Sequence, residues 1–179
     1  MITLPIPSLE GLVTERLLFR RLRNDDLDWW MDYINSAEAI RFMPFEVGSR
    51  RDAEGMIRRS QERYAEDGSG LHAVLLRESG VPVGQCGLLT QVVDGSPELE
   101  IGYHFLPQHW GHGYATEAAI GCKHFALENG LAPSVVSLID PGNHRSQAVA
   151  TRNGMERGKL TMHRGKEAYV YRIPLANAV

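Results

Sequence analysis

The sequence has few cysteines and no spacing typical of zinc sites or disulfide frameworks. Cys86 and Cys122 are the only two, and each stands in an apolar stretch. Structural zinc sites and disulfide-rich domains usually show paired cysteines at short spacings such as CxxC, which this chain lacks. We therefore expect both cysteines to be small buried residues.

Long apolar runs are also missing. No segment approaches the roughly 20 apolar residues of a membrane-spanning helix. The first residues, MITLPIPSLEG, lack the basic region and the apolar core of a signal peptide. These absences predict a cytoplasmic protein without a membrane partner.

The chain has no large excess of charge of either sign. Its formal net charge is −3, whereas nucleic-acid binding requires a strongly basic face, so we expect no nucleic-acid partner. A local group of arginines alternates with acidic residues, as on a solvated helix face. This group comprises Arg50, Arg51, Arg58, Arg59 and Arg63.

No repeat, linker or low-complexity segment interrupts the 179 residues. That length suits one domain with a substantial core and is short for two. The hydrophobic content of 43% is that of an ordinary globular protein. We predict a single domain over residues 1–179.

Hydrophobic patterning predicts strands and helices in a mixed order. Strands are expected at 12–22, 71–77, 81–93, 98–106 and 133–139 and in a final hairpin ending at Pro174 with its turn at 164–166; helices are expected from Asn24, over 49–67, from Tyr114 to about 129, and over 144–153. The three central strands follow one another through short turns, which predicts an antiparallel meander. The expected class is α+β, a mixed sheet with helices on both faces.

The segment QHWGHGYATEA, residues 108–118, places two glycines at the start of a helix, although glycine costs a helix about 1 kcal/mol relative to alanine. The first N–H groups of a helix lack partners and carry partial positive charge. Gly111 and Gly113 would let further N–H groups face the same point and let a phosphate approach the backbone. The segment predicts an anion cradle for a pyrophosphate, with Thr116 as an added hydroxyl; a tight turn with small residues for packing is the alternative.

Two other phosphate-binding motifs do not fit this segment. A Walker loop requires Lys followed by Ser or Thr after the second glycine. A dinucleotide-binding fingerprint requires a third glycine in a first βαβ unit, whereas this segment follows an antiparallel meander.

The segment PQHWGHGYATEA resembles the acyl-CoA-binding signature of the GNAT superfamily, and more narrowly the WGxGYATEA segment of its RimJ/RimL-like branch. TERLLFRRL, IGYHF and DPGNHRSQAVATRNGM also occur in the order of that branch, so the resemblance covers nearly the whole chain. It implies a layered α/β/α fold with a mostly antiparallel seven-stranded sheet. It also implies an N-acetyltransferase that uses acetyl-CoA and no metal.

The same resemblance implies which main-chain groups bind acetyl-CoA. Phe105 and Leu106 would bind the pantetheine arm in the gap beside their strand, and a strand N–H near Tyr103 would polarise the thioester carbonyl. The loop contacts would come from Trp110, Gly111, His112, Gly113, Tyr114, Ala115 and Thr116.

Side chains of the last helix and of the strand before the loop complete the implied site. Glu100 matches a family position that serves as base, commonly through water; an exposed carboxylate like Glu98 is the alternative. Asn143 matches a cofactor contact and Ser146 a serine of this branch that acts on the sulfur, while both also suit a helix cap. The family's general-acid tyrosine is absent, because Ala150 stands in its place.

The acceptor is expected to be a primary amine, either a peptide N-terminus or a small molecule, that attacks directly in a ternary complex. By resemblance, the segment IRFMPFE forms an acceptor wall with Phe42 and Met43, joined by Tyr103. Phe42 and Phe45 suit a plain core role equally well. The sequence leaves open the identity of the amine and whether the protein is a monomer or a homodimer.

Two alternatives to this function are a metal site and a binding module without catalysis. His104, His109 and His112 are close in sequence, but one is in a strand and two are in a loop whose backbone has another role, so we expect no metal site. A non-catalytic acyl-CoA-binding module on the same fold fits the missing tyrosine. Glu100 and Ser146, both retained, favour the enzyme.

Overall fold

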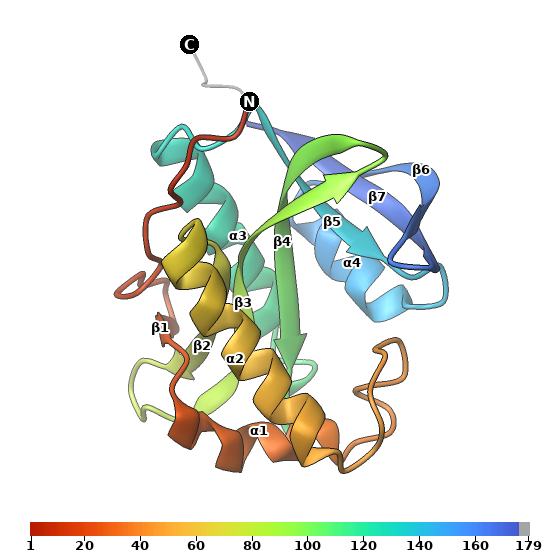
Figure 1. Cartoon of the computed structure of the whole chain (residues 1–179). Helices are drawn as coiled ribbons and strands as arrows, with labels where there is room; N and C mark the ends of the chain where they lie inside the picture. Colours follow the sequence, from red (N-terminus) through yellow and green to blue (C-terminus); the bar gives the residue numbers. More distant parts are fainter. Residues whose placement is uncertain (176–179) are drawn as a thin grey trace.

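The computed structural model describes residues 1–175, so the last four residues of the predicted domain lie outside the described part (Figure 1). The strands are β1 (Leu17–Arg21), β2 (Gly70–Leu76), β3 (Pro82–Val93), β4 (Ser96–Phe105), β5 (Ser134–Ile139), β6 (Glu156–His163) and β7 (Lys166–Pro174). The helices are η1 (Asn24–Asp26), α1 (Leu27–Ile34), α2 (Arg50–Glu66), η2 (Pro107–His109), α3 (Tyr114–Glu128) and α4 (His144–Arg152).

All seven strands form one sheet in the order β1-β2-β3-β4-β5-β7-β6. Every neighbouring pair is antiparallel except β4 and β5, which are parallel. The predicted meander is confirmed as β2, β3 and β4. The fold class is therefore α+β with a mostly antiparallel seven-stranded sheet, as predicted.

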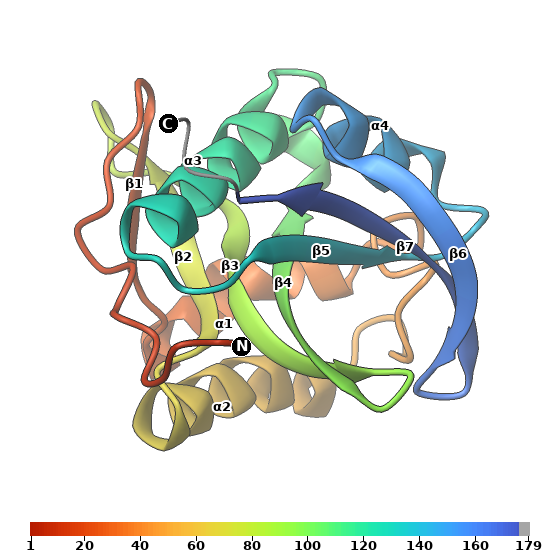
Figure 2. The ribbon, with the colours of Figure 1, turned by 90° about the horizontal axis from the view of Figure 1, so that it is seen from above.

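Helices cover both faces of the sheet, with α3 and α4 on one side and α1 and α2 on the other (Figure 2). Each face buries its own apolar cluster. Small residues of α3, such as Ala118 and Cys122, pack against β3 and β4, whereas Trp30 and Ile57 represent the cluster beneath α1 and α2. Cys86 and Cys122 are both buried and unbridged, with 3.6 Å between their Sγ atoms, as expected from the sequence.

The two parallel strands separate soon after they meet. β4 and β5 pair only at Leu99 with Val135 and at Glu100 with Val136, and then diverge (Figure 1). Just past the last pair, the Ser137 hydroxyl donates to the main-chain oxygen of Ile101 over 2.8 Å. Beyond that point, no strand among residues 1–175 pairs with the outer edge of β4.

The predicted strand over residues 12–22 is wrong in its first part. Only Leu17–Arg21 is a strand, because Gly11 has a φ of +87° and the chain doubles back on itself. The N–H of Phe19 donates to the Leu12 oxygen and that of Thr14 donates to the Leu17 oxygen. These bonds make a short hairpin that ends the extended segment.

The predicted start of the first helix at Asn24 is also wrong. Residues 24–26 form a 3₁₀ turn, and α1 begins only at Leu27. The buried Asp26 carboxylate accepts from the N–H of Arg23 at 2.7 Å and pairs with the Arg20 guanidinium at 2.6 Å. Asp26 therefore organises the helix entry. Among residues 1–175, no helix combines the length and apolar character needed to cross a membrane.

Candidate functional site

The loop before α3 presents a row of unpaired main-chain donors. Gly111 and Gly113 both have a φ of +80°, and Gly113 is the N-cap of α3. The first helical bond is donated by Glu117 to the Gly113 oxygen. The six N–H groups of residues 111–116 donate to no acceptor within the described chain, an arrangement found where helix starts bind anions.

The loop is open at its tip. A Cβ on Gly111 would meet nothing within 4 Å, and one on Gly113 would meet only the Arg16 side chain at 3.5 Å. The row does not include Trp110, whose N–H donates to the Pro107 oxygen at 3.1 Å. The Trp110 indole instead donates to the Phe105 oxygen at 2.8 Å, which ties the loop to the end of β4.

A charged clamp that the sequence analysis missed holds the loop from the side of β1. The Glu117 carboxylate accepts from the Thr14 hydroxyl at 2.6 Å and from the N–H and Nε of Arg16, each at 2.7 Å. Arg16 also donates to the His112 oxygen at 2.9 Å and covers the Tyr114 ring. Burial alone would raise the pKa of Glu117, but the bonds from Thr14 and Arg16 outweigh it and lower that pKa.

The outer edge of β4 has free groups at two positions. The Ile101 oxygen faces β5, since it accepts from Ser137, and main-chain direction alternates along a strand. The N–H groups of Tyr103 and Phe105 therefore face the same side, beyond the end of the β5 pairing.

Leu106 does not match its predicted role. Its N–H donates to the Val83 oxygen and its oxygen accepts from His109, each at 2.9 Å. The end of β3 and the turn η2 therefore already occupy both groups. Tyr103 and Phe105 are the positions where β4 has donors to offer.

Glu100 lies at the point where β4 leaves β5. Its carboxylate accepts from the Gln91 side chain at 2.6 Å. Burial raises the pKa of Glu100, while Gln91 and the main chain of Leu138 oppose the rise in part. Its neighbour Glu98 makes a two-fold ion pair with Arg172, at 2.6 and 3.0 Å, which gives Glu98 a structural role.

The first turn of α4 faces the Tyr103 side chain. Asn143 caps the helix, with its side-chain oxygen accepting from the Ser146 N–H at 3.1 Å. The Tyr103 hydroxyl donates to the Ser146 main-chain oxygen at 2.8 Å. Arg145 covers the Trp110 ring at 4.2 Å and pairs with Glu38 at 2.8 Å, so α4, the loop and the segment after α1 are held together.

The residues of the predicted acceptor wall lie in two different places. The Phe42 ring lies against the loop before α4, where a Cβ on Gly142 would be 3.2 Å from it. Met43 and Phe45 instead pack on the apolar cluster beneath α1 and α2. The structure thus brings Phe42 near the start of α4 and gives Phe45 a core role.

The three histidines do not converge on one point. His104 lies on the α1 side, where its Nδ1 is 3.2 Å from the Tyr33 hydroxyl, whereas His112 stacks on Tyr114 in the loop. Burial lowers the pKa of His104 to about 4. In residues 1–175 no group of three or more His, Cys, Asp and Glu side chains is arranged to hold a metal ion.

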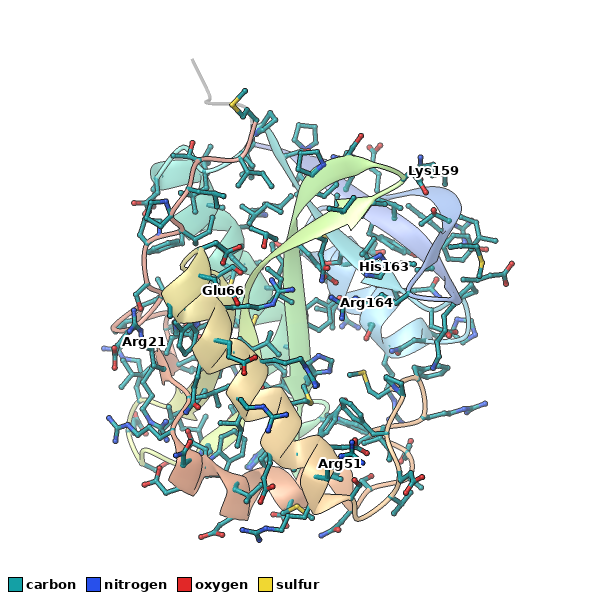
Figure 3. All side chains as sticks on the ribbon, viewed as in Figure 1. Arg21, Arg51, Glu66, Lys159, His163 and Arg164 are labelled. Carbon is teal, nitrogen blue, oxygen red and sulfur yellow. The ribbon has the colours of Figure 1, made fainter. Side chains whose placement is uncertain are left out.

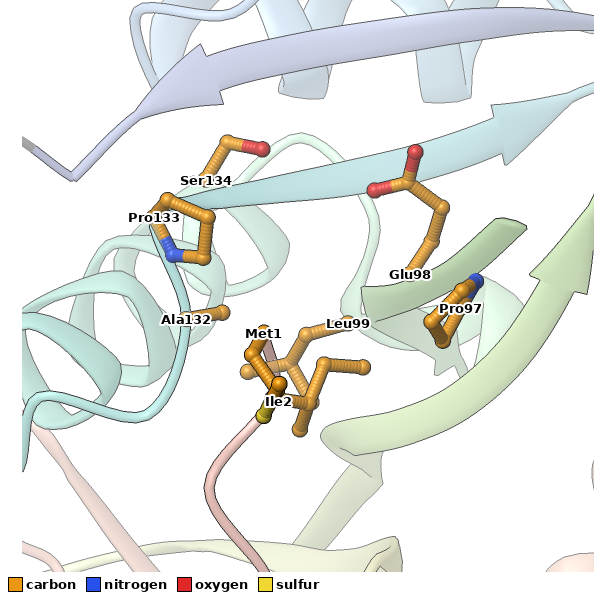
Figure 4. Close-up of a pocket in the computed structure, with 8 residues that line it drawn as sticks. All are labelled: Met1, Ile2, Pro97, Glu98, Leu99, Ala132, Pro133 and Ser134. Atoms are coloured by element: carbon orange, nitrogen blue, oxygen red, sulfur yellow. The ribbon is translucent and has the colours of Figure 1, made fainter.

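A small cavity of about 40 Å³ lies at the other end of the parallel pair (Figure 4). It is lined by Met1, Ile2, Pro97, Glu98, Leu99, Ala132, Pro133 and Ser134. These residues come from the N-terminal segment and from the beginnings of β4 and β5. The cavity is therefore separate from the loop and from the place where the strands diverge.

A family model described as an acetyltransferase (GNAT) domain matches residues 16–156. The uncharacterised protein YkkB of Bacillus subtilis (strain 168) is 29% identical over 160 residues, 89% of this chain and 93% of YkkB. The crystal structure of an acetyltransferase from Agrobacterium tumefaciens str. C58 is 29% identical with a TM-score of 0.78, and covers 93% of this chain and 95% of its own.

A third comparison is with RimL, a ribosomal L7/L12 alpha-N-protein acetyltransferase, in complex with coenzyme A. It superposes with a TM-score of 0.72 at 14% identity, covering 96% of this chain and 98% of RimL. That likeness is one of fold.

Proposed function

The chain belongs to the GNAT acetyltransferase domain family, and from that premise we propose that it transfers the acetyl group of acetyl-CoA to a primary amine. The observation that best supports this proposal is the row of six unpaired N–H groups at residues 111–116, beside the diverging strands. Main-chain donors at a helix start are suited to a pyrophosphate. The RimL structure that shares this fold binds coenzyme A, in line with this use of the loop.

The residues fit the proposed co-substrate along its length. The open loop around Gly111 and Gly113 would hold the pyrophosphate. The N–H groups of Tyr103 and Phe105 would bind the arm and the acyl oxygen, as a strand would. Asn143 and Ser146 would border the arm from α4.

Bound acetyl-CoA supplies an activated acyl group: the amine nitrogen forms a bond to its carbonyl carbon, the carbon–sulfur bond breaks, and the electron pair of that bond leaves with the sulfur. Glu100 accepts the proton that the amine loses, directly or through one water. A raised pKa at Glu100 makes it a stronger base than an ordinary carboxylate. The proton that neutralises the thiolate comes from water, with the Ser146 hydroxyl as a second donor.

The finer assignments are part of this proposal. Direct attack in a ternary complex suits a site in which the Glu100 carboxylate lies beside the diverging strands and can take the amine proton. The RimJ/RimL-like branch is supported by the order of its motifs, and the contact of Glu117 with Thr14 and Arg16 explains why two of those motifs occur together. A cytoplasmic location remains a prediction.

The proposal is tested by calorimetric titration with acetyl-CoA, with NADH and ATP as controls. We expect micromolar binding of acetyl-CoA alone, and its loss in Gly113→Trp, because the indole fills the cradle. Gly80→Trp is the matched control, since Gly80 also has a positive φ (+71°) and open space around it, in the turn before β3. No binding by the folded wild-type protein would contradict the proposal.

An acceptor screen with detection of released thiol then separates the enzyme from a non-catalytic acyl-CoA-binding module. Thiol release that depends on an added amine supports transfer. Tight binding without release with any amine would favour the binding module instead.

A further inference from the structure

Two arginines from distant segments, Arg63 and Arg164, lie near the candidate base, and a third, Arg59, lies farther along α2. Arg63 of α2 donates to the main-chain and side-chain oxygens of Thr90 at 3.2 and 3.3 Å. Arg164, at the turn between β6 and β7, donates to the Gln91 side chain at 3.2 Å, and Gln91 donates in turn to Glu100. Arg59 lies one helical turn before Arg63 on the same side of α2.

These residues lie on the face of the sheet that carries α1 and α2. The β6–β7 hairpin curls past the sheet edge toward that face (Figure 2), and Figure 3 shows Arg164 and His163 at its turn. The loop that cradles an anion is at the start of α3, on the opposite face. The arginines are therefore separate from the proposed cofactor contacts and belong to the side where an acceptor would enter.

Two arginines of the cluster have no direct ion-pair partner in the described part of the chain. Other arginines of α2 have partners on the helix surface: Arg50 pairs with Glu54 and Arg58 with Glu62. Within residues 1–175, no carboxylate forms an ion pair with Arg59 or Arg164.

The pKa values report the same imbalance. Burial and the charges of Arg164 and Arg58 lower the pKa of Arg59, while Asp52 and Glu62 oppose this shift in part; burial together with Arg164 lowers the pKa of His163. Like charges that act on one another raise the free energy of the folded chain, and an anion between them lowers it. A guanidinium fork offers paired donors that match a carboxylate or a phosphate.

We propose that the acceptor is a primary amine that also carries a carboxylate or phosphate, which binds between Arg59 and Arg164 while the amine lies beside Glu100. This inference rests on the proposed function and names the substrate class of that same site. Two kinds of molecule combine an amine with such an anionic group: a small anionic amine, or a peptide with acidic residues after its N-terminus.

The test compares acceptors that differ only in charge. γ-Aminobutyrate is compared with γ-aminobutyramide, aminopropylphosphonate serves as the phosphate-like probe, and Ser-Glu-Glu-Ala amide is compared with Ser-Gln-Gln-Ala amide. We expect a higher kcat/KM for the anionic member of at least one pair. The pair that shows the preference tells whether the acceptor is a small molecule or a peptide.

Arg59→Gln is the decisive variant because it does not contact Gln91 or Glu100. We expect it to reduce the preference for the anionic acceptor by about tenfold, the loss of one charge-assisted bond, with the KM for acetyl-CoA unchanged. Arg58→Gln, one residue earlier and paired with Glu62, is the matched control and should keep the preference.

The outcomes separate the two proposals. Equal use of neutral and anionic acceptors, or an equal preference in Arg59→Gln and Arg58→Gln, overturns the inference while acetyl transfer stands. Absence of acetyl-CoA binding overturns both.

Discussion

The carboxylate of Glu100 illustrates how position changes the chemistry of a residue. Glu98 and Glu100 lie on the same face of β4, yet one is locked to Arg172 and the other is bound by an amide. An amide leaves a carboxylate free to gain a proton, whereas a two-fold ion pair does not.

Glu100→Gln should lower kcat by about 100-fold, the usual contribution of a positioned base. A base must be deprotonated to act, so wild-type activity should fall as pH drops through the raised pKa of Glu100, and the variant should lack this acid limb. The check is a pH profile of kcat/KM. Glu98→Gln is the control and should keep the wild-type profile; equal losses in both variants would contradict a role for Glu100 as base.

A second residue-scale prediction concerns His72, buried beside the Tyr64 ring. Burial lowers the pKa of His72 from 6.5 to about 4, so between these values the unfolded chain binds a proton that the folded chain does not. Stability from this residue is complete above pH 6.5 and is lost on acidification. From pH 7.5 to pH 5 the loss is about 2 kcal/mol.

Urea unfolding at the two pH values measures this loss. His72→Phe should lose about 2 kcal/mol less than the wild-type protein over the same interval. Parallel stability curves for the two proteins would rule out His72 as the source. His104 shares the direction of shift and remains in both proteins, so it cancels in the comparison.

For single residues, the sequence was sufficient where the role depends on local backbone conformation. Gly111 and Gly113 were found because a positive φ at a helix start favours glycine. Arg16 was missed because its contact with Glu117 spans 101 residues of sequence. The arginines of α2 were assigned to a solvated helix face, and Arg59 is indeed exposed; an alternating charge pattern does not reveal that the charge of Arg164, 105 residues later, acts on it.

At the scale of elements, the hydrogen bonds between the β1 hairpin and the first turn of α3 support the loop. Glu117 holds Thr14 and Arg16 from α3. Glu117→Gln should loosen the loop and raise the KM for acetyl-CoA roughly tenfold, which corresponds to about 1.4 kcal/mol of binding free energy. The kcat should stay unchanged. Steady-state kinetics at varied acetyl-CoA measures this split.

Glu128→Gln provides the comparison for that variant, since Glu128 is an exposed residue at the end of the same helix. It should have a wild-type KM. A fall in kcat alone in Glu117→Gln would mean that the clamp acts on the reaction and not on the loop.

Element boundaries were predictable where a local signal fixed them. The helix predicted over 49–67 is α2, which the Ser49 side chain caps, and α3 begins at Tyr114 as predicted. The strand predicted over residues 12–22 was too long, because the β-branched and apolar residues there continue through a hairpin turn. The entry of α1 depends on Asp26 and its partner Arg20, a contact that only the folded chain makes.

At the scale of the whole molecule, the sheet lies between two large apolar clusters, one beneath α3 and one beneath α1 and α2. All the strands belong to this one sheet, so the clusters share it. A single domain predicts that the clusters unfold together. Leu88→Ala in the α3 cluster and Ile34→Ala in the α1 cluster should each cost about 2–5 kcal/mol in one transition.

Urea unfolding followed by circular dichroism and by tryptophan emission tests this expectation. Val92→Ala, at an exposed position of β3, should change stability by no more than about 0.5 kcal/mol. Two separate transitions in either core variant would mean that the clusters are independent units.

The overall class and the meander followed from the alternation of apolar residues, but the sheet order at the C-terminal end did not. β7 inserts between β5 and β6, and a hairpin pattern alone does not state which of its strands faces the sheet. The divergence of β4 and β5 was implied only by family resemblance, because strand separation depends on packing across the sheet.

The contact between Arg145 and Trp110 has an optical consequence. The chain has three tryptophans; Trp29 and Trp30 lie together in α1, whereas Trp110 stands in the loop beneath a guanidinium at 4.2 Å. A charge so near an indole shifts its emission, and any movement of the loop or of α4 changes that shift. The protein thus carries an intrinsic fluorophore at the candidate site, so Trp110→Phe isolates its signal and occupancy can be followed without a label.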